Sequence, residues 1–191
     1  MPDELLDVVN GDDEVIAREM RSIVHARGLL HRGVHVFLVA PDGRLIVQRR
    51  SALRPLLPLG LDGSVSEHVK AGESYGRAAR RGLEEELGLG GIAVHSLVKF
   101  RLAYGPNDNE ISTLFEGRAE PGRVTVDPQE VESIHALRLD ELEALRACGR
   151  EKFCPWFVEL LRWYRGEPSA LQVLRSYKND HLLLTERGRR R

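Results

Sequence analysis

Hydrophobic runs in the first third of the chain are short and are separated by turn residues, which is typical of β-structure. The run "GVHVFLVA" at 33–40 and the run "LIVQRR" at 45–50 flank the turn "PDGR", and together they predict a β-hairpin. A second hairpin is predicted near the N-terminus, where "LLDVVN" and "EVIARE" flank Gly11, Asp12 and Asp13. The chain therefore begins with antiparallel strands.

The spacing of apolar residues changes after Ser74. Ala79, Leu83 and Leu87 then recur at every fourth position, and Gly88 follows them. This spacing places the three side chains on one face of a helix, and a glycine directly after the last turn is a common helix stop. We therefore predict an amphipathic helix from Ser74 to Leu87.

The remaining pattern completes a mixed fold. A loop is predicted at 51–66, strands at 92–104, 110–119 and 123–126, and helices at 140–147 and 154–165, the second with Pro155 in its first turn. The order β-β-β-α-β-β-α favours an α/β fold of the α+β type, in which a mixed β-sheet is sandwiched between helices. Residues 1–165 are predicted to form one domain with an N-terminal hairpin, and residues 166–191 a C-terminal arm.

The composition of the 191-residue chain narrows the functional classes. The formal net charge is −1, so nucleic acid is not the expected partner, even for the basic end at 187–191. No apolar run approaches the roughly 20 residues of a membrane span, and the acidic start lacks the pattern of a secretory leader. Cys148 and Cys154 are too few for a disulfide framework. We expect a cytoplasmic protein with no membrane partner, and a homodimer formed through the arm is left open.

Three consecutive glutamates in the predicted helix are the first candidates for chemistry. Glu85 and Glu86 project toward the same side of the helix as position 82, so their carboxylates point toward one region. Such a pair is unfavourable unless it binds a cation, and Mg²⁺ prefers oxygen ligands. Glu84 points elsewhere and is spaced to pair with Arg80. The alternative is that all three glutamates form an ordinary solvated face.

The glutamates belong to a longer string that resembles the Nudix box, G-x5-E-x7-R-E-U-x-E-E-x-G-U, where U is aliphatic. The positions that match are Glu73, Arg81, Leu83, Glu85, Glu86, Gly88 and Leu89. Two positions depart from the box: Glu67 stands in place of the first glycine, and Gly82 in place of the first glutamate after the arginine. The preceding hairpin and the following strands also match the Nudix fold.

This resemblance implies an enzyme that cleaves diphosphate linkages with Mg²⁺, or alternatively with Mn²⁺. In that family the glutamates of this helix bind the metal, which neutralises the diphosphate and positions the attacking water. The catalytic residues carried over are Glu85 and Glu86 as metal ligands, and Glu73 and Arg81, of which Glu73 holds Arg81 or supplements the site. The carboxylate missing at Gly82 implies that a neighbour needs the space or that the metal site is rebuilt, with His68 or a ligand oxygen approaching the glycine.

A second similarity covers residues 5–165. The stretches "GLLHRGVHVFLVAPDGRLIVQRRS", "SVSEHVKAGES" and "DNEISTLFEGR" resemble the Nudix-like isopentenyl-diphosphate isomerase and the hydrolases closest to it. The isomerase binds a metal through histidines and carboxylates, and the matching residues are His31, His68, Asp108 and Glu110, with His25 one position out of register. The candidates for substrate binding are Arg50 and Arg54 for the diphosphate, Lys70, and Trp156 beside the organic group. The alternatives are solvated histidines, exposed arginines and a core tryptophan.

Two positions separate the possible reactions. Ser66 stands where the isomerase has a cysteine, and a hydroxyl is a far weaker acid than a thiol. The isomerase tyrosine aligns with Leu102, and Tyr104 lies two residues further along the same strand face. We therefore predict a Mg²⁺-dependent Nudix hydrolase that cleaves a small-molecule substrate, either a nucleoside diphosphate derivative or another organic diphosphate. Its general base is left open among Glu85, Glu110 and Glu130. The alternatives are an isopentenyl-diphosphate isomerase and a non-catalytic protein that binds nucleotide or diphosphate.

Overall fold

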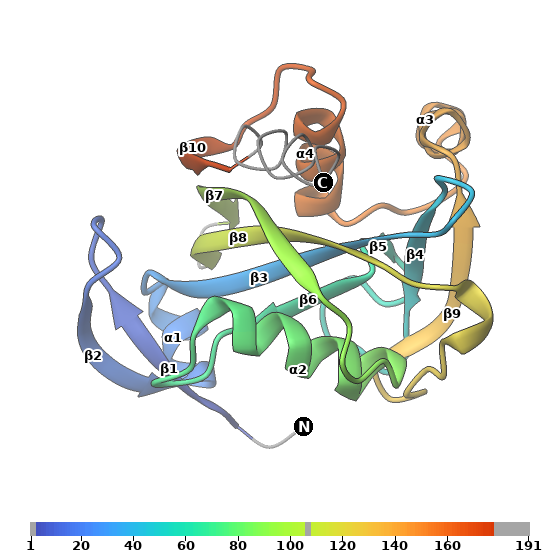
Figure 1. Ribbon diagram of the computed structural model, residues 1–191. Helices are drawn as coiled ribbons and strands as arrows, with labels where there is room; N and C mark the ends of the chain where they lie inside the picture. The colour runs from blue at the N-terminus through green and yellow to red at the C-terminus, as the bar shows by residue number, and fades with distance from the viewer. Residues whose placement is uncertain (1–2, 106–107, 178–191) are drawn as a thin grey trace, which may run out of the picture.

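The computed structural model describes residues 3–105 and 108–177 of the chain (Figure 1). Its elements are, in chain order, β1 (Leu5–Val9), β2 (Val15–Met20), α1 (Arg21–Arg27), β3 (His31–Val39), β4 (Leu45–Arg50), β5 (Leu61–Asp62), β6 (Val65–His68), α2 (Tyr75–Leu87), β7 (Val94–Gly105), β8 (Asp108–Arg118), the 3-10 turn η1 (Pro121–Arg123), β9 (Val131–Leu137), α3 (Leu139–Cys148), α4 (Pro155–Tyr164) and β10 (Gln172–Ser176). The two predicted hairpins, the end of α2 at a left-handed Gly88, and Pro155 at the start of α4 are confirmed.

The strand β3 lies at the centre of one mixed sheet. The strands follow the order β10-β7-β8-β3-β1-β2, while β4 and β6 also pair with β3, and β4 pairs in turn with β5 and β9. The central strand runs parallel to β8 and antiparallel to β1, β4 and β6. Residues from distant parts of the sequence therefore face one another around the N-terminal half of β3.

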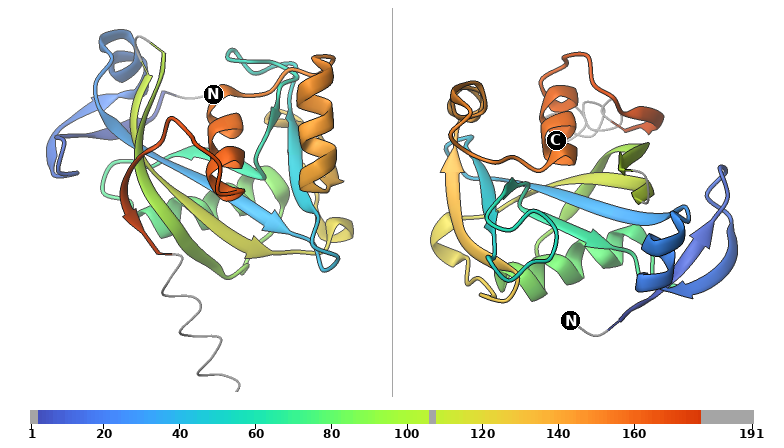
Figure 2. Two further views of the ribbon diagram at one scale, coloured as in Figure 1. Left: turned by 90° about the horizontal axis from the view of Figure 1, so that it is seen from above. Right: turned by 180° about the vertical axis from the view of Figure 1, so that it is seen from behind.

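Helices cover both faces of this sheet, with α2 below it and α4 above it in Figure 1, and Figure 2 shows the same layers from above and from behind. Leu83 of α2 packs with Val36 of β3 in one buried core. Phe157 of α4 packs with Phe100 of β7 in a second core on the other side. The predicted mixed sheet between helices is confirmed. None of the described helices is long and apolar enough to cross a membrane.

Some local predictions were wrong. Residues 123–126 do not form a strand, because the chain makes the turn η1 there, and Val124 and Val126 pack against the core without strand partners in the described structure. The predicted loop at 51–66 contains β5 and the start of β6. The elements α1 and β9 were not predicted.

The beginning of the predicted C-terminal arm adds a strand to the sheet, since β10 pairs antiparallel with β7. Residues 178–191, which include "HLLL" and the basic end at 187–191, lie outside the described residues. The division of the chain into a domain at 1–165 and an arm at 166–191 stays a prediction.

Candidate active site

A pocket opens where β3, β6, β7 and β8 meet the loop after β4 and the start of α4. The wall carries histidine and carboxylate side chains, the guanidinium groups of three arginines, and the apolar surfaces of Leu56, Tyr104 and Trp156. This mixture suits a ligand that has both an anionic part and an organic part.

Strand register explains why four of the predicted metal ligands meet at this pocket. His31 of β3 pairs with Glu110 across the parallel ladder to β8, and His68 of β6 pairs with Gly33, two residues further along β3. Because side chains two apart share one face of a strand, His31, His68 and Glu110 point to the same side. Asp108 lies two residues before Glu110 and joins the group, with ligand atoms of His31, Asp108 and Glu110 all within 4.8 Å of one another.

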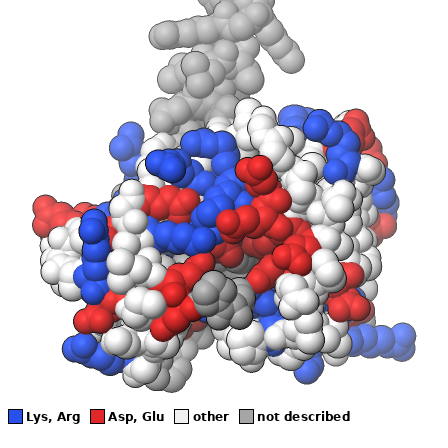
Figure 3. Space-filling model, turned by 90° about the horizontal axis from the view of Figure 1, so that it is seen from below, with Lys and Arg blue, Asp and Glu red and all other residues white. Residues whose placement is uncertain are grey.

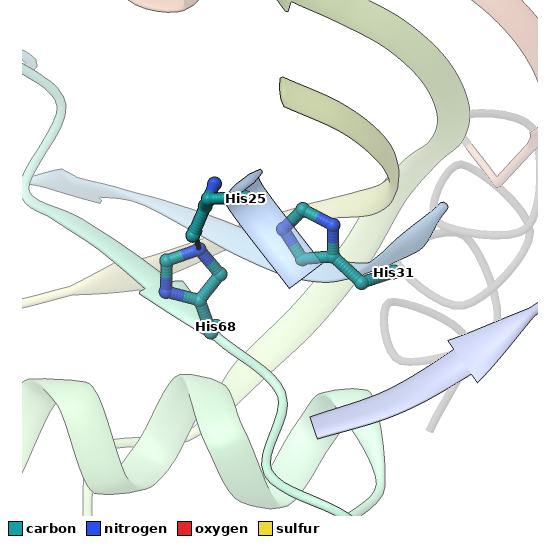
Figure 4. Close-up of side chains that lie close together, drawn as sticks. All are labelled: His25, His31 and His68. Carbon is teal, nitrogen blue, oxygen red and sulfur yellow. Dashed lines mark hydrogen bonds between the residues drawn. The ribbon is translucent and has the colours of Figure 1, made fainter. Parts of the chain in front are cut away.

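His25 completes the cluster from the helix α1. Its Nε2 lies 3.2 Å from Nε2 of His68 (Figure 4). Its Nδ1 lies 3.5 Å from Oδ1 of Asp108. Ligand atoms of His25, His31 and His68 also lie within 4.8 Å of one another. The sequence had placed this histidine one position out of register, because a short helix and a turn separate it from β3.

Hydrogen bonding prepares His31 to bind a metal ion. Its Nδ1 donates to the carbonyl oxygen of Leu29 at 2.9 Å, which leaves Nε2 with a free lone pair in the neutral ring. This Nε2 is fully buried and lies 3.5 Å from Oε1 of Glu110. Neither this nitrogen nor the buried Oδ1 of Asp108 has a hydrogen-bond partner among the described residues. Imidazole nitrogens together with carboxylate oxygens suit a divalent transition metal, so the residues present fit such an ion.

Metal binding at this cluster is expected to weaken at acid pH. Burial and the charge of Glu110 raise the pKa of Asp108 to about 6. Burial acts to lower the pKa of His31, but the interaction of the ring with the nearby carboxylate of Glu110 outweighs it, so the pKa of His31 is raised. Below its pKa each of these two ligands carries a proton that Co²⁺ must displace. The Co²⁺ affinity should therefore fall as the pH is lowered from neutral to below 6, by about tenfold per pH unit for each proton displaced. A Co²⁺ titration followed by its visible absorption at several pH values measures this, and a flat profile would contradict it.

Gly33 leaves the space that the carboxylate of Glu110 occupies. A Cβ at this position would lie 2.2 Å from Oε2 of Glu110 and 2.7 Å from Oγ of Ser112, which itself donates to that carboxylate. We expect Gly33→Ala to displace Glu110 and to lower Co²⁺ affinity by about tenfold or more, since ligand geometry and charge set metal affinity. Gly122→Ala, where a Cβ meets nothing within 4 Å, is the matched control. Equal Co²⁺ affinity in the two variants would rule out this role of Gly33.

The glutamates of α2 point in different directions. Glu86 is 4% exposed, and its Oε2 accepts a hydrogen bond from Nε2 of Gln48 at 2.9 Å. The side chain of Glu85 is 54% exposed, and its Oε2 accepts from Nη1 of Arg81 at 2.9 Å. Figure 3 shows acidic and basic side chains interleaved on the face that carries α2. The two predicted metal ligands are therefore neighbours in sequence with different surroundings.

Glu86 has the properties of a ligand for a hard cation. Its Oε1 and Oε1 of Gln48 are buried, and neither has a hydrogen-bond partner within the part of the chain that the structure describes. Burial raises the pKa of Glu86 well above its ordinary value, and the charge of Glu67 raises it further. A divalent cation would compensate this buried carboxylate and supply the missing contact, so the residues here fit Mg²⁺.

Arg81 lies at the centre of a carboxylate network on the same side of the molecule. Its Nε donates to Oε1 of Glu73 at 3.1 Å, and its Nη1 donates to Oε2 of Glu67 at 2.6 Å. Its Nη2 donates to the carbonyl oxygen of His68 at 2.8 Å and to Oε2 of Glu73 at 3.2 Å. Glu73 thus contacts Arg81, as the box implies.

The arginines predicted to bind substrate line the pocket, whereas Lys70 does not. The Nη1 of Arg50 lies 3.3 Å from Oδ2 of Asp62, and Arg54 forms an ion pair with Glu130. The Nζ of Lys70 lies 3.1 Å from Oε1 of Glu4, away from the pocket. Two guanidinium groups side by side can bind a diphosphate through paired hydrogen bonds.

A chain of polar contacts crosses the pocket floor. Nε2 of His35 lies 3.0 Å from the hydroxyl of Tyr104, and its Nδ1 lies 3.0 Å from Oγ of Ser66. Ser66 donates to Oδ1 of Asp62 at 3.1 Å, and Nε1 of Trp156 donates to the same oxygen at 2.8 Å. Leu102, the position that aligned with the isomerase tyrosine, does not line the pocket, whereas Tyr104 does.

Sequence reasoning missed Arg21, His35 and Gln48 in these surroundings. Side chains at every second position of a strand lie on the same face, so His35, four residues after His31, could have been predicted to face the site. No pattern marked the other two, since Arg21 reaches the pocket from an unpredicted helix and Gln48 reads as an ordinary strand residue.

Comparison with known proteins agrees with these features. The family model described as NUDIX domain matches residues 29–157. An uncharacterized Nudix hydrolase of Streptomyces coelicolor is 38% identical over 154 residues, which cover 80% of this chain and 83% of the relative. An isopentenyl-diphosphate Delta-isomerase of Serratia proteamaculans is 30% identical over 168 residues, which cover 84% of this chain and 90% of the relative.

Among solved structures, the protein DR0079 of Deinococcus radiodurans is similar, with a TM-score of 0.72, 29% sequence identity, and coverage of 83% of this chain and 98% of that one. The region matched by the family model contains the central hairpin of β3 and β4, the helix α2 and the strand β8. All the residues that line the pocket, apart from Arg21 and His25, also fall within the matched region. The chain is a member of the Nudix hydrolase family, in the branch that is similar to isopentenyl-diphosphate isomerase.

Proposed function

We propose that this protein is a Mg²⁺-dependent hydrolase that cleaves the diphosphate linkage of a nucleoside diphosphate derivative or another organic diphosphate. The observation that carries this proposal is that Arg50, Arg54 and Glu67 line the same pocket, with the charges of Arg54 and Glu67 both acting on the buried carboxylate of Glu86. Arginine side chains that can bind phosphate oxygens thus lie close to carboxylates that can bind a metal ion.

The roles of the residues follow from this arrangement. Arg50 and Arg54 bind the diphosphate and hold its phosphorus atoms near the carboxylates. When bound, Mg²⁺ offsets the negative charge that a diphosphate brings and that increases in the transition state. Leu56 and Trp156 contact the organic part and exclude water from it. Glu110 is a poor candidate for the general base: burial acts to raise its pKa, but the interaction with the nearby His31 ring outweighs this and lowers it.

Isomerisation of isopentenyl diphosphate is the second candidate. It is favoured by the similar isomerase, by the histidine cluster, and by Tyr104 and Trp156 in the pocket. It is opposed by Ser66, which replaces the cysteine. Within the described structure no cysteine lines the pocket: Cys154 is buried with its thiol near Asp62, and Cys148 is exposed on α3.

Phosphorus NMR of the protein with Mg²⁺ and a panel of organic diphosphates tests both reactions. The panel contains nucleoside diphosphates, nucleoside triphosphates, dinucleoside polyphosphates, sugar nucleotides and isopentenyl diphosphate. We expect cleavage products from at least one organic diphosphate. Dimethylallyl diphosphate as the product of isopentenyl diphosphate would establish the second candidate instead. Tight metal-assisted binding with no product from any compound would show a binding protein.

A further inference from the structure

The two positions that depart from the Nudix box lie against each other. A Cβ placed on Gly82 would lie 2.5 Å from Cγ1 of Val65 and 2.9 Å from Cγ of Glu67. The neighbours that need the space at Gly82 are therefore Val65 and Glu67, and not His68, which the sequence had suggested. A side chain at position 82 and the side chain of Glu67 in its present position would compete for the same space.

Glu67 brings a carboxylate to the acidic face of α2 from the strand β6. Its Oε2 accepts a hydrogen bond from Nη1 of Arg81 at 2.6 Å, and the same Nη1 donates to Oε2 of Glu85 at 2.9 Å. Glu67 and Glu85 therefore meet at one nitrogen atom. Glu67 also lines the pocket, where Arg50 and Arg54 lie.

Glu86 lies on the same side of α2 as Gly82, because it follows Gly82 by one helical turn. Burial and then the charge of Glu67 raise the pKa of Glu86, and Arg54 acts on both glutamates in the opposite direction. Oε1 of Glu86 is buried and unpartnered among the residues that the structure describes. A cation is the group that would satisfy this oxygen and also relieve the repulsion between the two carboxylates.

We propose that Glu67 supplies, from β6, the metal-binding carboxylate that α2 lacks at Gly82, so that Glu67, Glu85 and Glu86 together bind Mg²⁺. The glycine and the glutamate of the box have exchanged places across the contact between helix and strand, and the carboxylate has stayed in the same region. This inference rests on the proposed function, in which the metal at this site binds the diphosphate of the substrate.

Calorimetric titration of the substrate-free protein with Mg²⁺ tests this assignment. Mg²⁺ is the appropriate probe because imidazole binds it poorly, so the histidine cluster contributes little. We expect Glu67→Gln to lower Mg²⁺ affinity by about tenfold or more, since each carboxylate ligand adds charge to a hard-cation site. Glu84→Gln, which changes an exposed glutamate of α2, should leave the affinity unchanged.

The double variant Glu67→Gly/Gly82→Glu returns both residues to the arrangement of the box. We expect it to regain most of the Mg²⁺ affinity that Glu67→Gln loses. The assignment is overturned if Glu67→Gln binds Mg²⁺ as tightly as Glu84→Gln, or if the double variant keeps its circular dichroism spectrum but binds as weakly as Glu67→Gln. If the double variant does not fold, the result for Glu67→Gln decides alone. The titration contains no substrate, so its outcome is independent of whether any diphosphate is cleaved.

Discussion

Replacing Glu86 by glutamine is expected to lower turnover of a diphosphate substrate by two to three orders of magnitude, because a metal ligand contributes about 3–4 kcal/mol of charge stabilisation to the transition state. Glutamine has nearly the same shape and still accepts the hydrogen bond from Gln48. It cannot carry the negative charge that holds a divalent cation. Steady-state kinetics with saturating Mg²⁺ measure the loss.

The stability of the same variant separates a role in catalysis from a role in folding. The pKa of Glu86 is raised in the folded protein by burial and by Glu67. Such a group favours folding least above its folded pKa, since the unfolded chain then ionises freely and the folded one does so at a cost. Glu86→Gln should therefore be at least as stable as the wild type in metal-free urea unfolding at neutral and higher pH. Unchanged turnover in this variant would remove Glu86 from the reaction.

Local patterns made most of the fold predictable. The hairpins and α2 are encoded within single stretches of sequence, as alternation, turn residues or a four-residue repeat. The strands β5, β6 and β9 were missed because they are defined by their partners: β9 exists through its ladder with β4. The opposite error arose at Val124 and Val126, which alternate as a strand would and are partly buried, but lie beside α2 and its core. A segment that buries alternate side chains without pairing with a strand therefore has the same alternating sequence pattern as a strand.

The candidate site was predictable residue by residue, but its geometry was not. The box and the isomerase resemblance named His31, His68 and Glu110, which the registers of β6 and β8 against β3 then bring together. The relation between Glu67 and Gly82 was invisible in the sequence. Each residue reads as the loss of a box position, and only the packing of α2 on β6 shows that the two positions lie against each other.

Arg81→Met is expected to lower the free energy of unfolding by about 3 kcal/mol, because it leaves partly buried carboxylates without their cation. The Arg81 side chain is 16% exposed and bonds to Glu67, Glu73 and Glu85. Methionine keeps the volume of the aliphatic stem, so the loss reports mainly the charge. Arg80→Met changes the exposed neighbouring arginine and should cost less than about 0.5 kcal/mol. Urea unfolding of both variants in metal-free buffer gives the comparison.

Magnesium should reverse part of that loss. In the wild type, Arg81 and a divalent cation compete for the oxygens of Glu67 and Glu85, which share Nη1 of Arg81. Without the guanidinium, no side chain competes with the ion for these oxygens, so the ion binds the folded variant more tightly. Because the ion binds the folded state and not the unfolded one, tighter binding raises the free energy of unfolding. Saturating Mg²⁺ is therefore expected to raise the unfolding free energy of Arg81→Met by more than that of the wild type or of Arg80→Met. An equal effect on all three proteins would mean that the ion does not bind at the oxygens that Arg81 now neutralises.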